Sequence, residues 1–286
     1  DGKVITRQGN RLWCHDASDG SELWDYVPAH GSGDGLVSGV GYDADLDVVF
    51  VQFLTWSHDE YTFTRLDMGG NVDWEVTVPG LSGEFLGNSW DAVVGDKYYV
   101  MGWQVLRGID KSNGSVSWAK NVMNDFPDFA GGSLICGDGD RVYVSVLEMD
   151  WNTFEEVGIL AAYTLGGVLD WSHPFTDEKS PSSVAVDDVH VFVAAGGWGT
   201  PTDVVKLNRS TGALVDSHAH TGALSYIAVD PERVYAAGDD ILVLDLDTLS
   251  VEHQITSIPG YGVFALILAT SVSYLSINSL YRVDPE

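Results

Sequence analysis

The sequence has few cysteines and no long apolar run, and each shortage excludes a class of protein. Cys14 and Cys136 are the only cysteines among 286 residues, and two thiols cannot build a disulfide framework. Because the repeat described below places them in separate units, we expect both to be buried free thiols. No apolar run approaches the roughly 18 residues of a membrane-spanning helix, so we expect no direct membrane insertion.

Positive charge is also scarce. Against 42 Asp and Glu residues stand 14 Lys and Arg residues, six of them lysine, which gives a formal charge of −28. Phosphate contacts need lysine or arginine, so this balance argues against a nucleic-acid partner and an anionic membrane. Brine would screen the self-repulsion, because the Debye length falls to about 3 Å at 1 M salt. The composition resembles that of proteins from salt-loving archaea and their viruses, with an ordinary acidic secreted protein as the alternative.

What the sequence does contain is a repeat. An apolar strand, an aspartate, three residues, a glycine, three residues and a tryptophan recur along the chain, most clearly in RGIDKSNGSVSW. Several copies are degenerate, with Thr164 or Asn208 in place of the aspartate. The residues that we assign to this structural frame are Asp16, Gly20, Trp24, Asp67, Gly70, Trp74, Asp110, Gly114, Trp118, Gly167, Trp171, Asn208, Gly212, Asp245 and Asp284.

The segments between the repeated turns have the texture of β-strands. VVFVQF, KYYVMG, RVYVSV and HVFVAA are short β-branched or aromatic runs bounded by glycine and aspartate. Four such strands in each repeat predict an all-β chain that forms a β-propeller of four-stranded antiparallel blades. The repeat resembles the blades of quinoprotein-like propellers, with RGIDKSNGSVSW and KLNRSTGAL as the best matches, and the resemblance covers nearly the whole chain.

One repeat shows the strand assignment. We predict strand A over Asn88–Val94, strand B over Lys97–Met101, strand C over Gln104–Asp110 and strand D over Ser115–Val122. In the turn between strands C and D, the aspartate accepts a local hydrogen bond and the glycine supplies a positive φ. The tryptophan near the start of strand D is expected to pack between neighbouring blades and to bury on the order of 200 Å².

The two ends of the chain carry partial repeats. KVITRQ, RLWCHD and ELWDYV match strands B, C and D, whereas GVFALIL, VSYLSI and SLYRVD match strands A, B and C. Seven anchor residues, Asp16, Asp67, Asp110, Thr164, Asn208, Asp245 and Asp284, predict seven blades, and a six-bladed ring in which the partial repeats share one blade is the alternative. We expect one domain over residues 1–286, closed by its ends. Asp1 is not a start methionine, which is consistent with a removed leader or with a place in a larger chain.

A second set of aromatic residues lies in the segments that join strand B to strand C and strand D to strand A. In a propeller these segments emerge on one face, and loops concentrate binding residues. Exposed rings stack on sugars or bind apolar side chains of a partner. An alternative is that these tryptophans only cap the blade interface. The candidate binding residues are Trp56, Trp103, Trp151, Trp198, Phe126, Phe129 and Tyr261.

The sequence predicts no catalytic residue and no cofactor. Quinoprotein dehydrogenases hold their quinone against a vicinal disulfide beside calcium, and this chain has no adjacent cysteines, so the resemblance implies the scaffold without the redox activity. Asp43, Asp45 and Asp47 alternate as in a calcium loop but lack its glycine, which favours a tight acidic turn over a calcium site. His218 and His220 share a strand face without an evident third zinc ligand.

These observations predict a non-enzymatic binding or assembly module that recognises a protein or a glycan. The setting is a cell surface, a virion surface or the extracellular medium in high salt. The alternative is an enzyme with a site in the central funnel, either a glycan-acting hydrolase or a quinoprotein-type oxidoreductase. Asn113 and Asn208 begin glycosylation sequons in predicted turns, although asparagine is also an ordinary turn residue.

Overall fold

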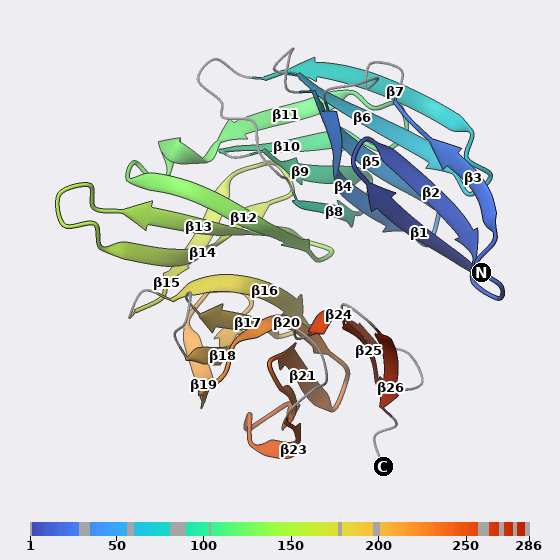
Figure 1. The fold of residues 1–286 in the computed structure, drawn as a ribbon. Helices are drawn as coiled ribbons and strands as arrows, with labels where there is room; N and C mark the ends of the chain where they lie inside the picture. The colour runs from blue at the N-terminus through green and yellow to red at the C-terminus, as the bar shows by residue number, and fades with distance from the viewer. Residues whose placement is uncertain are drawn as a thin grey trace. The chain divides into compact units, whose positions relative to one another are not determined.

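The computed structural model contains almost only β-strands (Figure 1). The one helix among the described residues is the 3-10 helix Val122–Asn124. The strands form seven antiparallel sheets, which confirms the all-β prediction. The residues that the structure describes are 2–28, 35–55, 60–80, 90–102, 104–176, 179–196, 201–256, 263–268, 272–276 and 279–283.

Contacts along the chain define two compact units. Their ranges are Asp1–Asp125, Gly139–Val142 and Thr164–Val168 for the first unit, and Phe126–Asp138, Tyr143–Tyr163 and Leu169–Glu286 for the second. The expectation of a single domain over residues 1–286, closed by its two ends, stays a prediction.

Three sheets lie in the first unit, and their strands are adjacent in chain order. The first sheet contains β1 (Lys3–Gln8), β2 (Arg11–Asp16) and β3 (Glu22–Tyr26). The second contains β4 (Gly35–Asp43), β5 (Val48–Thr55), β6 (Glu60–Asp67) and β7 (Val72–Pro79). The third contains β8 (Trp90–Val94), β9 (Lys97–Met101), β10 (Val105–Asp110) and β11 (Val116–Asn121).

The other four sheets belong mainly to the second unit. The first of them contains β12 (Phe129–Gly137), β13 (Arg141–Met149), β14 (Glu156–Thr164) and β15 (Leu169–Pro174). The next contains β16 (Ser180–Val186), β17 (His190–Gly196), β18 (Thr202–Asn208) and β19 (Leu214–His220). The last two contain β20 (Leu224–Val229), β21 (Arg233–Gly238), β22 (Ile241–Asp245) and β23 (Val251–Ile255), then β24 (Val263–Leu268), β25 (Val272–Ser276) and β26 (Ser279–Val283).

Burial explains why the inner strands are so apolar. Every side chain of β5 is buried, and in β9 only the first residue is not. A strand that is covered on both faces has a nearly continuous apolar sequence, whereas an outer strand tolerates polar residues. The outer strands β11 and β23 are accordingly more exposed and more polar. The two inner strands of a sheet therefore supply most of its core.

The predicted strand limits agree with the structure to within a residue or two. Strand β9 has the predicted limits, and β10 and β11 each begin one residue late. Strand β11 ends at Asn121, because the Asn121 side chain caps the 3-10 helix by accepting a hydrogen bond from the Met123 N–H at 2.9 Å. The predicted start of strand A, Asn88, lies outside the described residues.

The fold is a β-propeller. Five sheets have four strands, and the sheets at the two ends of the chain have three. Those three-stranded sheets hold strands B, C and D at the start and strands A, B and C at the end, as the partial repeats predicted. The blade count is seven if each three-stranded sheet is counted as a blade and six if the two are counted together.

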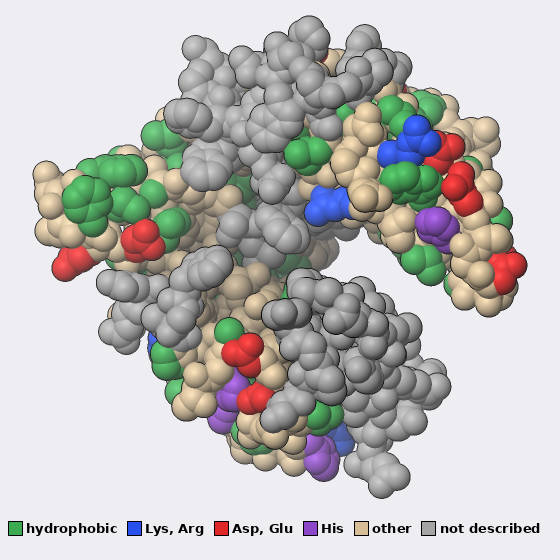
Figure 2. Space-filling model, in the orientation of Figure 1, with side chains coloured by type: hydrophobic (Ala, Val, Ile, Leu, Met, Phe, Trp, Pro, Cys, Tyr) green, Lys and Arg blue, Asp and Glu red, His purple; other side chains and the backbone are tan. Residues whose placement is uncertain are grey.

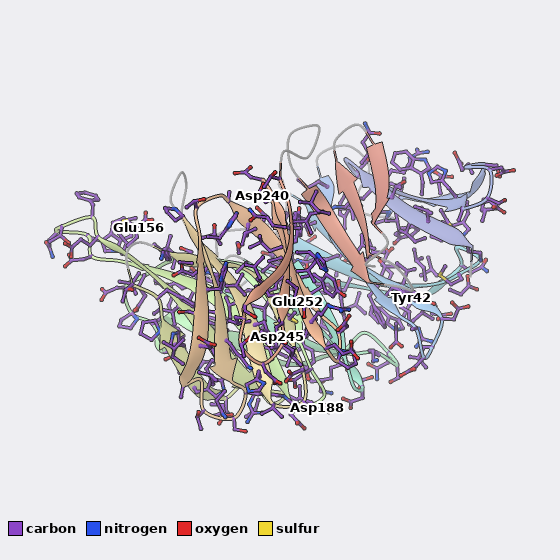
Figure 3. The ribbon with its side chains drawn as sticks, turned by 90° about the horizontal axis from the view of Figure 1, so that it is seen from below. Tyr42, Glu156, Asp188, Asp240, Asp245 and Glu252 are labelled. Carbon is purple, nitrogen blue, oxygen red and sulfur yellow. The ribbon has the colours of Figure 1, made fainter. Side chains whose placement is uncertain are left out.

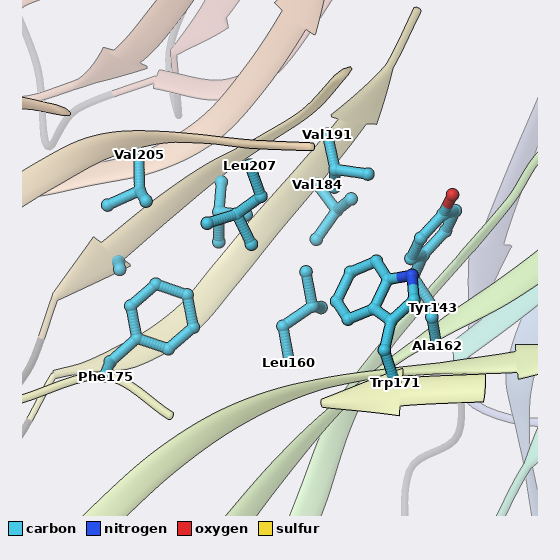
Figure 4. Packing of buried hydrophobic residues seen from close by; sticks show 11 residues of the cluster. Tyr143, Leu160, Ala162, Trp171, Phe175, Val184, Val191, Val205 and Leu207 are labelled. Carbon is cyan, nitrogen blue, oxygen red and sulfur yellow. The ribbon is translucent and has the colours of Figure 1, made fainter. Parts of the chain in front are cut away.

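Each unit has hydrophobic cores of its own. In the second unit, Leu160, Trp171 and Leu207 belong to one cluster of strand side chains (Figure 4). Cys14 is a buried free thiol, as expected, and burial raises its pKa. Cys136 is also a free thiol, but the expectation that it is buried holds only in part, because it is a partly buried residue packed against that cluster, where burial raises its pKa to about 11.

Candidate functional site

The turns between strands C and D share one hydrogen-bonding pattern. At Asp110, its N–H donates to the Ser115 carbonyl oxygen and the Gly114 N–H donates to the Asp110 carbonyl oxygen, both at 2.9 Å. The Asp110 carboxylate accepts hydrogen bonds from the Ser112 hydroxyl and the Ser112 N–H, which lower its pKa. Gly114 has a φ of 75°, a conformation that glycine adopts without strain. The same backbone pattern recurs at Asp16, Asn208 and Asp245.

The repeated tryptophans pack on these turns. The indole N–H of Trp118 donates to the Leu165 carbonyl oxygen at 3.0 Å, and its ring covers Gly167 so closely that a Cβ there would lie 2.8 Å from ring carbons. Trp24, Trp74 and Trp171 make the corresponding bonds to Met68, Lys111 and Arg209. Their rings cover Gly70, Gly114 and Gly212. These four indoles hold the scaffold together by packing on the turn of the next repeat.

The two ends of a sheet carry different connections. In the second unit, Asp188 and Asp245 lie in turns at one end of their sheets, and Asp240 lies in the β21–β22 connection at the opposite end (Figure 3). We call the end that carries the B–C and D–A connections the loop end, and the other end the turn end. Candidate binding residues are expected at the loop end.

Four of the candidate binding residues, Trp56, Trp103, Trp198 and Tyr261, lie outside the described residues, and their role stays a prediction.

Phe126 and Phe129 are not exposed, so the expectation that they present their rings to a partner is wrong. Each side chain is only 6% exposed. The segment that joins β11 to β12 begins with the 3-10 helix, and the Phe129 N–H then donates to the Phe126 carbonyl oxygen at 3.2 Å. This compact connection turns both rings inward, where burial of apolar area favours them.

Trp151 is exposed, as the candidate role requires. It lies in the β13–β14 connection with 61% of its surface accessible, and Phe154 beside it is 70% accessible. Val157, at the start of β14, is exposed as well. Figure 2 shows hydrophobic side chains gathered at the end of this hairpin, with acidic side chains beside them. We call the segment 150–157 the aromatic hairpin tip.

The hairpin tip extends beyond strand β15. The register of β14 with β15 begins at Ile159, and the Phe175 N–H donates to the Gly158 carbonyl oxygen at 2.8 Å, so residues 150–157 lie past the last of these contacts. Glu156 lies at the end of the hairpin in Figure 3. The Met149 N–H donates to the Asp128 carbonyl oxygen at 2.9 Å and fixes the base of the tip. The rings are therefore presented on an ordered hairpin.

Carboxyl groups of the hairpin differ in their acidity. Hydrogen bonds from the Asn152 and Thr153 N–H groups lower the pKa of Asp150. Two residues earlier, burial raises the pKa of Glu148, and the Asp128 carboxylate adds to that increase. Residues 142–178 contain neither lysine nor arginine. The negative charge of the tip is therefore not neutralised by a basic side chain from the same segment.

Two of the candidate metal ligands, Asp43 and His220, are engaged in other contacts. Asp43 is buried, pairs with the Lys111 ammonium group, and accepts hydrogen bonds from the Asp45 and Leu46 N–H groups. The segment is thus a tight acidic turn beside a cleft of about 560 Å³. The His220 ring lies 3.3 Å from the Asp240 carboxylate. Among the described residues, no three histidine, cysteine or acidic side chains are grouped to hold a metal ion.

The side chains of both sequon asparagines accept hydrogen bonds within their turns. The Asn113 side-chain oxygen accepts a hydrogen bond from the Ser115 N–H at 2.8 Å. The Asn208 side-chain oxygen accepts from the Ser210 and Thr211 N–H groups. Glycosylation at either position stays a prediction. In the described part of the chain, no helix is long and apolar enough to cross a membrane.

Comparisons with known proteins identify relatives of this architecture. A family model described as outer membrane protein assembly factor BamB matches residues 1–147. No curated protein sequence matches significantly. One similar solved structure is BamB from Moraxella catarrhalis, with 15% sequence identity and a TM-score of 0.58 over 98% of this chain and 92% of that chain. Sqt1 from Saccharomyces cerevisiae has 10% identity and a TM-score of 0.67 over 99% of this chain and 82% of that chain. A chain of the mitotic checkpoint complex has 11% identity and a TM-score of 0.70 over 99% of this chain and 84% of that chain.

Proposed function

Because this chain belongs to the family of the outer membrane protein assembly factor BamB, we propose that it is a non-enzymatic module that binds a partner protein at the loop end of its sheets. Propellers of this kind commonly act as protein-binding or assembly modules. The end of the sheets that binds the partner, and the residues that contact it, are inferred from the side chains of this chain alone.

The observation that carries the proposal is the aromatic hairpin tip. Trp151 and Phe154 expose large rings to solvent at a loop end, whereas the four repeated indoles are packed on neighbouring turns. Exposed aromatic side chains on an ordered support are the anchors that dominate many protein interfaces.

We place the protein outside the cytoplasm, at a cell or virion surface in high salt. The formal charge of −28 supports this setting, because multimolar salt screens the repulsion that such a charge creates. Unfolding by denaturant, followed from low to multimolar salt, tests it. Stability is expected to rise with salt, and greater stability at low salt would contradict a halophilic origin.

Site-specific photocrosslinking tests the protein-binding proposal. Ser210 and Thr221 are exposed and flank strand β19 at its turn end and loop end, respectively. A photoreactive amino acid at Thr221, and a second one at Asn152 in the hairpin tip, are expected to yield a discrete crosslinked protein in cells that make this chain. The matched probe at Ser210 is expected to yield none.

Other crosslinking results would point elsewhere. A protein captured only from Ser210 would move the binding surface to the turn end. Absence of any captured protein, together with turnover of a glycan substrate or dye reduction after addition of quinone and calcium, would replace the proposal by an enzyme. Binding to a glycan array without a protein partner would replace the protein ligand by a carbohydrate.

A further inference from the structure

The β13–β14 connection repeats the backbone of the C–D turns. The Asp150 N–H donates to the Glu155 carbonyl oxygen at 3.0 Å, and the Phe154 N–H donates to the Asp150 carbonyl oxygen at 2.6 Å. The Asp150 carboxylate accepts from the Asn152 N–H at 2.8 Å. Each of these bonds has its counterpart in the Asp110 turn. The sequence DWNTFE is therefore the repeated turn at the loop end of a sheet, with phenylalanine in the place of glycine.

This substitution forces Phe154 into the left-handed backbone region, with a φ of 60°. That region costs an L-residue about 1–2 kcal/mol relative to glycine. Leu249 occupies the same place in the Asp245 turn with a φ of 50°, but its side chain is buried in a core cluster. Burial of leucine offsets the strain there. Phe154 is exposed, so packing of its side chain within the described chain offsets little of the backbone strain.

The charge around the rings restricts what can bind. Asp150, Glu155 and Glu156 flank Trp151 and Phe154, and the nearest basic residues in the sequence are Arg141 and Lys179. Exposed aromatic faces attract lysine and arginine side chains, and the neighbouring carboxylates pair with them. A second copy of this chain, with 42 acidic and 14 basic residues, would instead bring few lysine or arginine side chains to complement the tip.

We propose that the aromatic hairpin tip docks a basic, apolar segment of a partner protein, with Trp151 and Phe154 as the anchors. The inference rests on the proposed function and assigns it a site and a ligand chemistry. Burying two aromatic side chains covers about 300–500 Å², and a standard interface buries about 800 Å² on each partner. The tip is thus the anchor of the interface, and adjoining residues complete it.

A variant pair isolates the tip without disturbing the fold. Trp151→Ser combined with Phe154→Gly removes both rings, and glycine keeps the backbone conformation of the turn. Leu214→Ser is the matched control, because Leu214 is exposed to a similar extent at the turn end of β19. The denaturant midpoints of both proteins are measured first; that of the double variant is expected at or slightly above the wild-type value, and that of Leu214→Ser close to it.

The probe is a displayed library of random peptides, selected on the wild-type chain at the lowest salt concentration at which the chain stays folded. Enriched peptides are expected to combine lysine or arginine with large apolar residues. Their affinity is expected to fall at least about tenfold in the double variant, equivalent to about 1.4 kcal/mol, and to stay within twofold in Leu214→Ser. Binding is also expected to weaken as salt rises, because the charge contacts are screened.

Several outcomes would overturn the inference, and they are distinguishable. Peptides that bind the double variant as tightly as the wild type would reject the tip while leaving the protein-binding function in place. Enrichment of acidic peptides would reject the ligand chemistry. Glycan binding or self-association that is lost only in the double variant would replace the partner protein by that ligand. Absence of any enriched peptide would reject the docking of a basic, apolar segment, whereas a protein crosslinked at Thr221 or Asn152 would still support the proposed function.

Discussion

Two tryptophans of one sheet, Trp151 and Trp171, have opposite environments although they lie twenty residues apart in the sequence. Trp171 lies in β15, is 8% exposed and donates its indole N–H to the Arg209 carbonyl oxygen at 3.0 Å. Trp151 follows β13 and is mostly solvent-exposed. The position relative to the repeated turn decides the role: a tryptophan after the turn packs on the next repeat, and one inside it faces solvent.

Truncating the two indoles gives the largest expected difference. Trp171→Ala removes a ring that packs on Gly212 and belongs to a core cluster, so it is expected to lower the free energy of unfolding by about 3–5 kcal/mol. Trp151→Ala is expected to change it by less than about 0.5 kcal/mol. Chemical denaturation followed by far-UV circular dichroism measures both. Equal losses would mean that Trp151 also belongs to a core.

The glycine beneath the indole sharpens the same comparison. Gly212 has a φ of 68°, and a Cβ there would overlap the Trp171 ring. Gly212→Ala therefore combines backbone strain of about 1–2 kcal/mol with overpacking of about 1–3 kcal/mol. Gly20 has a φ of 74° but no atom near its Cβ position, so Gly20→Ala is expected to cost the backbone strain alone. The difference between their denaturation midpoints measures the ring contact, and identical midpoints would exclude it.

The scaffold could be predicted because short stretches of the sequence specify its turns and strands. An aspartate, a glycine four residues later and a tryptophan four residues after that specify a turn and the strand that follows it. The hairpin tip uses the same turn, but phenylalanine at the glycine position hides it, and only the aspartate and the spacing remain as signals. Burial of Phe126 and Phe129 follows from the path of the connection between β11 and β12, which the repeat pattern does not specify.

Two of the repeated turns have another residue in place of glycine, Phe154 in one and Leu249 in the other. Replacing each by glycine gives a third, smaller test. Phe154→Gly is expected to stabilise the protein by about 0–1.5 kcal/mol, because relief of about 1–2 kcal/mol of strain equals or exceeds the added entropy of glycine in the unfolded chain, about 0.5–1 kcal/mol. Leu249→Gly, the matched control, is expected to destabilise the protein, because loss of this buried side chain, about 2–5 kcal/mol, outweighs the same relief of strain. Destabilisation by Phe154→Gly would show that the phenyl ring packs within the chain.

The smallest expected effect is the opposite pH response of Glu148 and Asp150, at the base and the tip of the same hairpin. Burial raises the pKa of Glu148, and backbone hydrogen bonds lower that of Asp150. A carboxyl group with a lowered pKa stabilises the folded state at neutral pH, and this contribution is lost as pH falls through the folded pKa. A carboxyl group with a raised pKa destabilises the folded state at neutral pH, and protonation relieves it.

Asp150→Ala is therefore expected to lower the unfolding midpoint at pH 7 but not in acid, and Glu148→Gln to raise it at pH 7 but not in acid. Carboxyl chemical shifts followed by NMR from neutral to acidic pH measure the two groups directly, with Glu148 expected to take up its proton at the higher pH. If the order of protonation were reversed, the hairpin would not hold Asp150 in the turn, and the outward presentation of Trp151 and Phe154 would lose its support.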